Sequence, residues 1–190
     1  LRSIINSSSL RVPDGTGLLL AAKILGIPLK ERVAGIDLAL SLIELAEKRG
    51  YKIYLLGSKD GVGEMAARGL SKKYPDLNIV GTHHGYFTDD SKIIEEINYL
   101  KPDILFVGMG TPRQEKWLAK NLQKLDVKLA MTVGGSIDVF AKRVRRAPIL
   151  FQRLNLEWLY RFFREPWRGE RMISLLTFLR LILKERKTKV

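Results

Sequence analysis

The chain has 190 residues, of which 46% are hydrophobic and 28% charged, and it carries a formal net charge of +13. This balance is typical of a folded globular domain and excludes a disordered chain. The sequence contains no cysteine, which excludes disulfides, cysteine-based metal sites and a thiol nucleophile. A strongly basic chain is expected to bind an anionic partner, such as a membrane surface or a nucleic acid.

Helix and strand patterns alternate along most of the chain. The spacing of apolar and turn residues first predicts two helices, over 18–25 and 37–49, with Asp37 capping the second and Gly50 after its end. Strands and helices then alternate over 53–56, 62–74, 77–80, 91–100, 104–108, 112–125 and 129–133. Continuous apolar strands between helices predict an α/β fold with a mainly parallel sheet covered by helices on both faces.

The C-terminal part differs in composition, which predicts a sheet domain over 1–141 and an appendage over 142–190. The appendage contains 14 Lys and Arg against 4 Asp and Glu, so it holds +10 of the net charge. A predicted helix over 171–184 is apolar apart from a polar stripe made of Ser174, Thr177, Arg180 and Lys184. This pattern favours an anionic membrane surface, and a helix docked on the sheet domain is the open alternative. The apolar run is too short to cross a bilayer.

Each predicted strand from 53–56 onward ends in a turn, and all four turns contain glycine. Ligands bind at the carboxyl ends of parallel strands, where glycine lets a phosphate approach the backbone. Glycine is also the usual residue of tight turns, so each turn has a purely structural explanation as well. None of the turns has the pattern G-x-G-x-x-G, which disfavours a nucleotide-dependent oxidoreductase.

The segment 111–114, with the sequence TPRQ, has two interpretations. Thr111 at the cap and Gln114 at the third helical position are typical of a capping box. Alternatively, this helix start binds a diphosphate, with Gln114 or Arg113 donating hydrogen bonds.

The segment 12–17 contains Asp14 within the sequence PDG, which is a common turn. Alternatively, Asp14 provides a carboxylate at a helix entrance, where it can act as general base for a hydroxyl nucleophile. The neighbouring Gly15 and Gly17 would leave room for a substrate.

The only two histidines, His83 and His84, are neighbours in or beside a predicted strand. Adjacent strand residues point to opposite faces, so we expect the pair not to bind one metal ion, and we expect no metal in the protein. Tyr86 either stacks on a nucleobase or packs as an ordinary aromatic residue.

Together, these motifs resemble the WecG/TagA/CpsF glycosyltransferase family, and its TagA branch in particular. The match follows the family's order along nearly the whole chain. Its motifs are PDGTG at 13–17, ERVAGID at 31–37, GxGxPxQEKW at 108–117, VGGSID at 133–138, RAP at 146–148, LEWLYR at 156–161 and EPWR at 165–168.

The resemblance implies a Rossmann-like glycosyltransferase domain with a helical C-terminal appendage. The implied reaction moves N-acetylmannosamine from a UDP-sugar donor to the 4-hydroxyl of N-acetylglucosamine on diphospho-undecaprenol. It would form a β-1,4 linkage with inversion, without a metal ion or cofactor, in the synthesis of wall teichoic acid or a related cell-surface polysaccharide. Related enzymes use other UDP-sugars, so the donor stays open.

The motif match also assigns expected roles to residues. Asp14 matches the catalytic base, and Arg161 matches an arginine that reaches the diphosphate, where a guanidinium offsets the charge of the leaving UDP. The expected substrate-binding residues are Arg32, Tyr86, Gln114, Asp138, Arg168 and Arg171.

The resemblance also implies a cytoplasmic enzyme, peripheral on the inner face of the cell membrane, that forms a homo-oligomer and binds no nucleic acid. Family members have a further N-terminal segment with a Thr-Pro-Asn motif that this sequence lacks. We therefore expect a fragment without the first strand and part of the acceptor site. A basic RNA-binding α/β module is the competing hypothesis, and the wide aliphatic surface of the appendage disfavours it.

Overall fold

The computed structural model describes residues 1–29, 31–164 and 169–188, without the side chains of 161, 169–176, 187 and 188. The chain forms two compact units, each described here by itself. The sheet unit consists of Leu1–Arg11 and Gly35–Arg145, and the helical unit consists of Val12–Ala34 and Arg146–Val190. The chain leaves the sheet unit close to the boundary predicted at Lys142. The helical unit is nevertheless discontinuous in sequence, because it also includes residues 12–34.

The described residues of the sheet unit form one four-stranded parallel sheet in the order β2-β1-β3-β4. The strands are β1 (Lys52–Gly57), β2 (Asn78–His83), β3 (Ile104–Gly108) and β4 (Leu129–Thr132). The two central strands, β1 and β3, are buried along nearly their whole length, as their continuous apolar sequences require. The predicted α/β fold with a parallel sheet is confirmed.

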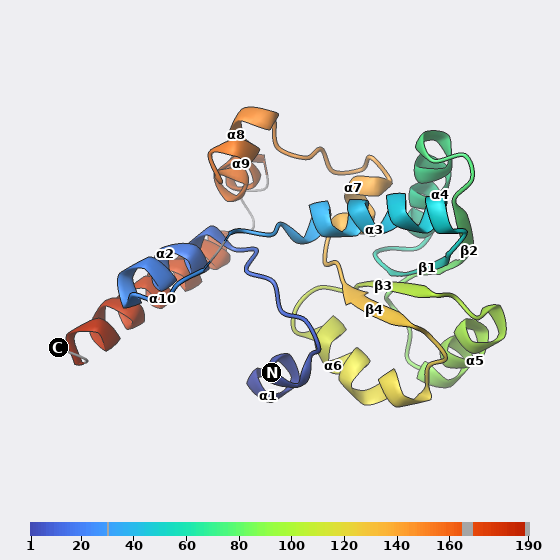
Figure 1. Ribbon diagram of the computed structural model, residues 1–190, viewed down its shortest axis with the longest axis horizontal. Helices are drawn as coiled ribbons and strands as arrows, with labels where there is room; N and C mark the ends of the chain where they lie inside the picture. The colour runs from blue at the N-terminus through green and yellow to red at the C-terminus, as the bar shows by residue number, and fades with distance from the viewer. Residues whose placement is uncertain (30, 165–168, 189–190) are drawn as a thin grey trace. The chain divides into compact units, whose positions relative to one another are not determined.

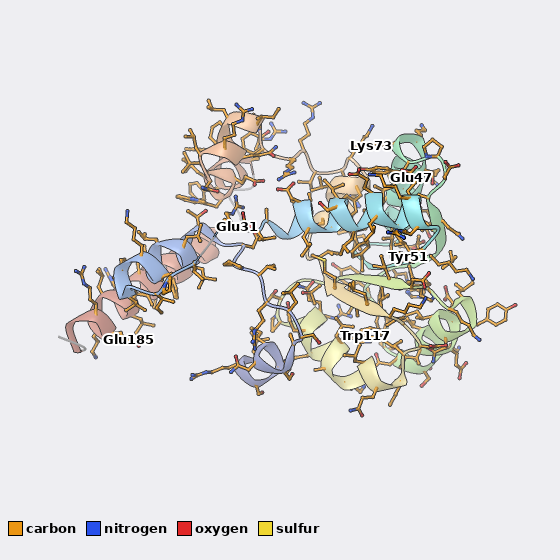
Figure 2. All side chains as sticks on the ribbon, in the orientation of Figure 1. Glu31, Glu47, Tyr51, Lys73, Trp117 and Glu185 are labelled. Atoms are coloured by element: carbon orange, nitrogen blue, oxygen red, sulfur yellow. The ribbon has the colours of Figure 1, made fainter. Side chains whose placement is uncertain are left out.

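Helices cover both faces of this sheet (Figure 1). On one face lie α3 (Gly35–Arg49), α4 (Val62–Lys73) and the short α7 (Ser136–Phe140). On the other lie α5 (Asp90–Leu100) and α6 (Arg113–Asn121), and α1 (Arg2–Ser7) packs beside α6. Trp117 lies on the side of α6 that faces the sheet (Figure 2), packed in a core cluster with Leu56 and Leu105.

Asp90 ties the start of α5 to α6. Its carboxylate accepts hydrogen bonds from Trp117 Nε1 at 2.9 Å, Lys120 Nζ at 2.6 Å and Asn121 Nδ2 at 3.3 Å. The hydrogen bond from Lys120, followed by those from Asn121 and Trp117, holds the pKa of Asp90 below its ordinary value. The two helices on this face are therefore joined by polar contacts as well as by apolar packing.

Two predicted helix boundaries are wrong in detail. Asp37 does not cap α3, because the helix begins two residues earlier, at Gly35, and Asp37 lies in its first turn. The helix predicted over 112–125 ends at Asn121 and continues as a 3-10 turn, η1 (Leu122–Lys124). Gly50 does follow the end of α3, with a positive φ of 68° that suits glycine.

The helical unit contains α2 (Thr16–Leu25), α8 (Ile149–Arg153), α9 (Glu157–Arg164) and α10 (Gly169–Thr188). Here α2 and α10 lie side by side (Figure 1), so residues 12–34 belong with the C-terminal segment. Within α10, Ile182 is buried, whereas Leu181 and Leu183 are exposed. The stripe residues Thr177, Arg180 and Lys184 are also exposed, and the side chain of Ser174 lies outside the described residues. Among the described helices, none is long and apolar enough to cross a membrane.

Candidate active site

The carboxyl ends of β1 and β3 form the centre of the candidate site in the sheet unit. From β1 the chain runs to β2 on one side and then to β3 on the other, so the strand order reverses between β1 and β3. Ligands of open α/β sheets bind at this switch point. Gly57 has a φ of 140°, and a Cβ there would collide with the backbone of Gly108. Glycine is therefore required where the two strand ends meet.

The turn after β1 is held by main-chain hydrogen bonds to both neighbouring turns. Ser58 donates its N–H to the carbonyl of Gly108 at 2.9 Å, and its own carbonyl accepts from the N–H of Gly85 at 2.9 Å. The Ser58 hydroxyl also donates to Asp138 Oδ1 at 2.9 Å. This bond fixes one carboxylate of α7 beside the strand ends, where a ligand of such a sheet would bind.

Gln114 joins two of the glycine turns. Its side chain is buried, and its Oε1 accepts from the N–H groups of Gly110 at 3.2 Å and Gly134 at 3.1 Å. Its Nε2 donates to Glu115 Oε1 at 2.8 Å. The predicted capping box is wrong, because Pro112 occupies the cap position without a side-chain cap bond. Gln114 instead reaches one residue further back and across to the turn after β4.

Tyr86 is exposed on this edge of the sheet unit. Its side chain is 66% exposed, so the alternative of a packed aromatic residue is wrong. The Arg113 guanidinium lies 5.7 Å from the centre of its ring, which is within the range of a cation–π contact. The ring is available for stacking on a planar group, and an arginine lies beside it.

The two histidines do not point to opposite faces as predicted. Their ring centres lie 4.4 Å apart, because β2 ends at His83 and the chain turns at His84. His84 Nδ1 accepts the N–H of Tyr86 at 3.2 Å, so it orders the turn that presents Tyr86. Among the described residues, no group of three His, Asp or Glu is arranged to hold a metal ion.

A second candidate site lies in the helical unit, centred on Arg32. The guanidinium donates from Nε to the main-chain carbonyl of Asp14 at 2.6 Å and from Nη2 to Asp14 Oδ1 at 3.2 Å. Nη1 donates to Asn155 Oδ1 at 2.9 Å, and Nη2 also lies 3.4 Å from Glu157 Oε1. The structure thus brings Asp14 and Arg32 together, two residues that the sequence placed 18 positions apart.

Sequence reasoning missed Asn155 and Glu157 as members of this cluster. Glu157 is buried at the start of α9, and its second oxygen, Oε2, lies 3.5 Å from Arg146 Nε. Two signals were available: Glu157 lies in the LEWLYR motif at 156–161, and it is one of only 4 acidic residues among the last 49. An acidic side chain in so basic a segment favours an ion pair. The sequence did not indicate which arginine would be its partner.

The cluster combines two carboxylates with two guanidinium groups, and their exposure differs. The side chain of Asp14 is 54% exposed, whereas that of Glu157 is only 10% exposed. Arg32 and Arg146 are also mostly covered, at 16% and 20% exposed. Asp14 is therefore the carboxylate of this group that an incoming hydroxyl can reach, and it can accept a proton there.

The three arginines of the C-terminal segment expected at the substrates are only partly described. Arg161 lies in α9, one turn after Glu157, and Arg171 lies in α10, but neither side chain is among the described residues. Arg168 lies outside the described residues altogether.

Sequence comparison identifies relatives of the chain. The profile of the Glycosyl transferase WecG/TagA/CpsF family matches residues 1–190. A protein of Staphylococcus aureus (strain MRSA252), named N-acetylglucosaminyldiphosphoundecaprenol N-acetyl-beta-D-mannosaminyltransferase, is 38% identical over 185 residues, covering 97% of this chain and 72% of the relative. A protein of the same name from Bacillus subtilis (strain 168) is 36% identical over 186 residues, covering 98% and 73%. The chain therefore belongs to the WecG/TagA/CpsF family of glycosyltransferases.

Proposed function

We propose that this glycosyltransferase moves N-acetylmannosamine from UDP-N-acetylmannosamine to the 4-hydroxyl of N-acetylglucosamine on diphospho-undecaprenol. In this reaction the Asp14 carboxylate takes the proton of the acceptor hydroxyl. The hydroxyl oxygen forms a bond to C1 of N-acetylmannosamine while the bond from C1 to the β-phosphate oxygen breaks. UDP leaves with the electron pair of that bond, and a single displacement inverts C1 to give a β-1,4 linkage.

The observation that carries the proposal is the arrangement of Asp14. Asp14 lies just before α2, whose cap residue is Gly15. Its half-exposed carboxylate is oriented by Arg32. A general base needs to be accessible and held in a fixed orientation, and the exposure of Asp14 and its bond to Arg32 support this role. The lipid-linked acceptor and the transferred N-acetylmannosamine are taken from the names of the Staphylococcus and Bacillus relatives, whereas the UDP donor and the 4-hydroxyl rest on the motif resemblance.

The donor is proposed to bind at the carboxyl edge of the sheet unit. The exposed ring of Tyr86 would stack on uracil, and Asp138, fixed by Ser58, would accept hydrogen bonds from the uridine. Gln114 would contribute indirectly, since its oxygen already holds two of the turns that border the donor. Arg161, Arg168 and Arg171 would offset the charge of the leaving diphosphate, which is the task of a metal ion in other enzymes.

A donor screen tests this proposal. The chain is incubated with a short-chain lipid analogue of GlcNAc-diphospho-undecaprenol and with UDP-N-acetylmannosamine, UDP-N-acetylglucosamine or UDP-glucose, and UDP release and disaccharide formation are measured. We expect transfer from UDP-N-acetylmannosamine at a rate that EDTA does not change, and a β-linkage in the product by NMR. Transfer only from another donor would refute the proposed substrate, and loss of activity in EDTA would refute metal independence.

We also propose that the helical unit binds an anionic membrane surface, where the lipid-linked acceptor resides. Exposed apolar side chains on and beside α2 and α10 support this: Leu18, Leu20, Ile27, Leu181 and Leu183. Lys and Arg of the same unit would add about 1 kcal/mol each near anionic lipid. The variant Leu181→Asp/Leu183→Asp is expected to lose co-flotation with phosphatidylglycerol vesicles, whereas a variant at an exposed apolar residue of the sheet unit, Tyr99→Asp, keeps it. Unchanged flotation of the double variant would refute this surface.

A further inference from the structure

We infer that Glu157 is a positioning residue that holds the catalytic base Asp14 in place through Arg32. This inference rests on the proposed function of Asp14 and extends it to a second carboxylate. Glu157 itself does not touch the acceptor in this scheme. It acts on the reaction only through the guanidinium that lies between the two carboxylates.

The first argument is the geometry of the Arg32 guanidinium. Its Nη2 lies between two carboxylate oxygens, 3.2 Å from Asp14 and 3.4 Å from Glu157. Its Nε donates to the main-chain carbonyl of Asp14, so Arg32 fixes both the backbone and the side chain of that residue. A planar guanidinium fixed at several atoms has little freedom to rotate, and it passes this restraint on to Asp14.

The second argument is that Glu157 is buried and that each of its carboxylate oxygens lies beside a different arginine. Its side chain is 10% exposed, and its two oxygens have different guanidinium partners, Arg32 and Arg146. Arg146 is itself only 20% exposed. Removing one member of a covered ion-pair group leaves the others without compensation, which is costly. A neutral residue at position 157 would therefore remove one charged partner from each of Arg32 and Arg146, and Arg32 would change its position.

The third argument is a second hydrogen-bonded connection to Arg32, made by Asn155, two residues before Glu157. Asn155 lies in the turn between α8 and α9 with a positive φ of 59°, a conformation that asparagine tolerates better than most residues. Its side chain accepts from Arg32, and its main-chain carbonyl accepts from the hydroxyl of Thr16 at 2.8 Å. The turn just before Glu157 is thus bonded to Thr16 and Arg32, which lie near the two ends of residues 12–34. Two parts of the chain more than 120 residues apart are fixed together here.

The balance of charges in the cluster explains why a carboxylate is needed at position 157. The group of Asp14, Arg32, Arg146 and Glu157 has two negative and two positive charges, so it is close to neutral as a whole. With Glu157 paired to both guanidinium groups, Asp14 is not the sole counter-ion of Arg32. Its carboxylate can then remain half-exposed and face an acceptor while one of its oxygens is bonded to Arg32.

The test is a double-mutant cycle on turnover, carried out with Glu157→Gln and Arg32→Lys. Glu157→Gln keeps the shape but removes the charge, and we expect kcat to fall about 10- to 100-fold, since small displacements of a reacting group have effects of this size. KM for the donor is expected to change less than 3-fold. In the Arg32→Lys background, the same Glu157→Gln change is expected to lower kcat by no more than about 2-fold, because the guanidinium that connects Glu157 to Asp14 is already absent.

A matched control removes a negative charge from the same unit without touching the cluster. Glu31, labelled in Figure 2, is exposed and directly precedes Arg32 in sequence. Glu31→Gln is expected to keep kcat within about 2-fold of the unmodified chain. All assays are run below the unfolding midpoint of every variant, so that a loss of folded protein does not enter kcat.

The outcomes separate this inference from the proposed function. Absence of transfer by the unmodified chain, or full activity of Asp14→Asn, would overturn the proposed function and the inference with it. If the unmodified chain is active and Asp14→Asn is not, normal kcat in Glu157→Gln would overturn the inference alone. An equal fall in kcat on both backgrounds would do the same, because it would show a role that does not pass through Arg32.

Discussion

The bond network of Gln114 predicts a large loss of stability when its side-chain oxygen is removed. Gln114→Leu keeps the approximate volume but leaves the N–H groups of Gly110 and Gly134 without their acceptor. Each buried donor left unpaired costs about 1–3 kcal/mol, so two would cost about 2–6 kcal/mol. Because both of these bonds are only part-buried, we expect the lower half of that range, about 2–4 kcal/mol. For a chain of this size, that corresponds to a fall in the thermal midpoint of about 5–12 °C.

The assay is urea and thermal unfolding followed by circular dichroism, without ligand. The matched control is Gln123→Leu, the same substitution at an exposed position in η1, for which we expect a change within about 0.5 kcal/mol. Isothermal titration with UDP is measured for both variants below their midpoints. The structural role of Gln114 predicts that Gln114→Leu lowers the stability, and that UDP affinity does not fall without this loss of stability.

A different result would refute this reasoning. If Gln114→Leu unfolded within 1 °C of the unmodified chain and lost only UDP binding, the oxygen would not be joining the two turns. Gln114 would then be a direct donor contact, and the hydrogen bonds to Gly110 and Gly134 would contribute nothing measurable to folding.

Three further predictions follow from the same structure. Asp14→Asn is expected to lower kcat about 10²- to 10⁴-fold with unchanged UDP binding, whereas exposed Asp76→Asn stays within 2-fold; equal activity of the two would contradict the general-base role. Gly57→Ala is expected to destabilise by about 3 kcal/mol in urea unfolding, because a Cβ meets backbone there, whereas Gly135→Ala, with open space around it, is expected to be near neutral. Asp90→Ala is expected to lose about 1–3 kcal/mol with its three hydrogen bonds. The folded pKa of Asp90 is lowered, so its contribution to stability is present above the unfolded pKa of about 3.9 and is lost as pH falls through the folded pKa. Urea titrations from pH 7 to 2 measure the difference in unfolding free energy between Asp90→Ala and the unmodified chain. A difference that did not shrink at low pH would contradict this prediction.

The strands of the sheet were predictable because their sequence pattern is local. The run ILFVG at 104–108 is apolar throughout and ends in glycine, and it forms β3 with the predicted bounds. The helix starts were less predictable. Asp37 is a good cap residue by type, but α3 begins at Gly35, because tertiary packing buries Ile36 and extends the helix beyond the local signal.

The candidate site was predictable only in part. Asp14, Arg32, Gln114 and Asp138 were recognised by motif, but their partners were not. Sequence spacing cannot show that Arg32 bonds to Asn155 and Glu157, since these contacts join segments more than 120 residues apart. The histidine pair was misjudged for a related reason: the alternation rule holds within a strand, and β2 ends at His83.

By itself, the sequence determined the α/β class, the position of each strand, the basic character of the C-terminal segment and the family. These properties follow from residue type and short-range periodicity, which act within one turn or one strand. Only the tertiary structure decided that residues 12–34 join the C-terminal segment in one unit, that Gln114 links two glycine turns, and that Glu157 lies behind the arginine that holds Asp14. Those arrangements depend on buried polar and charged groups finding partners from distant segments, and the need for a partner does not specify which one.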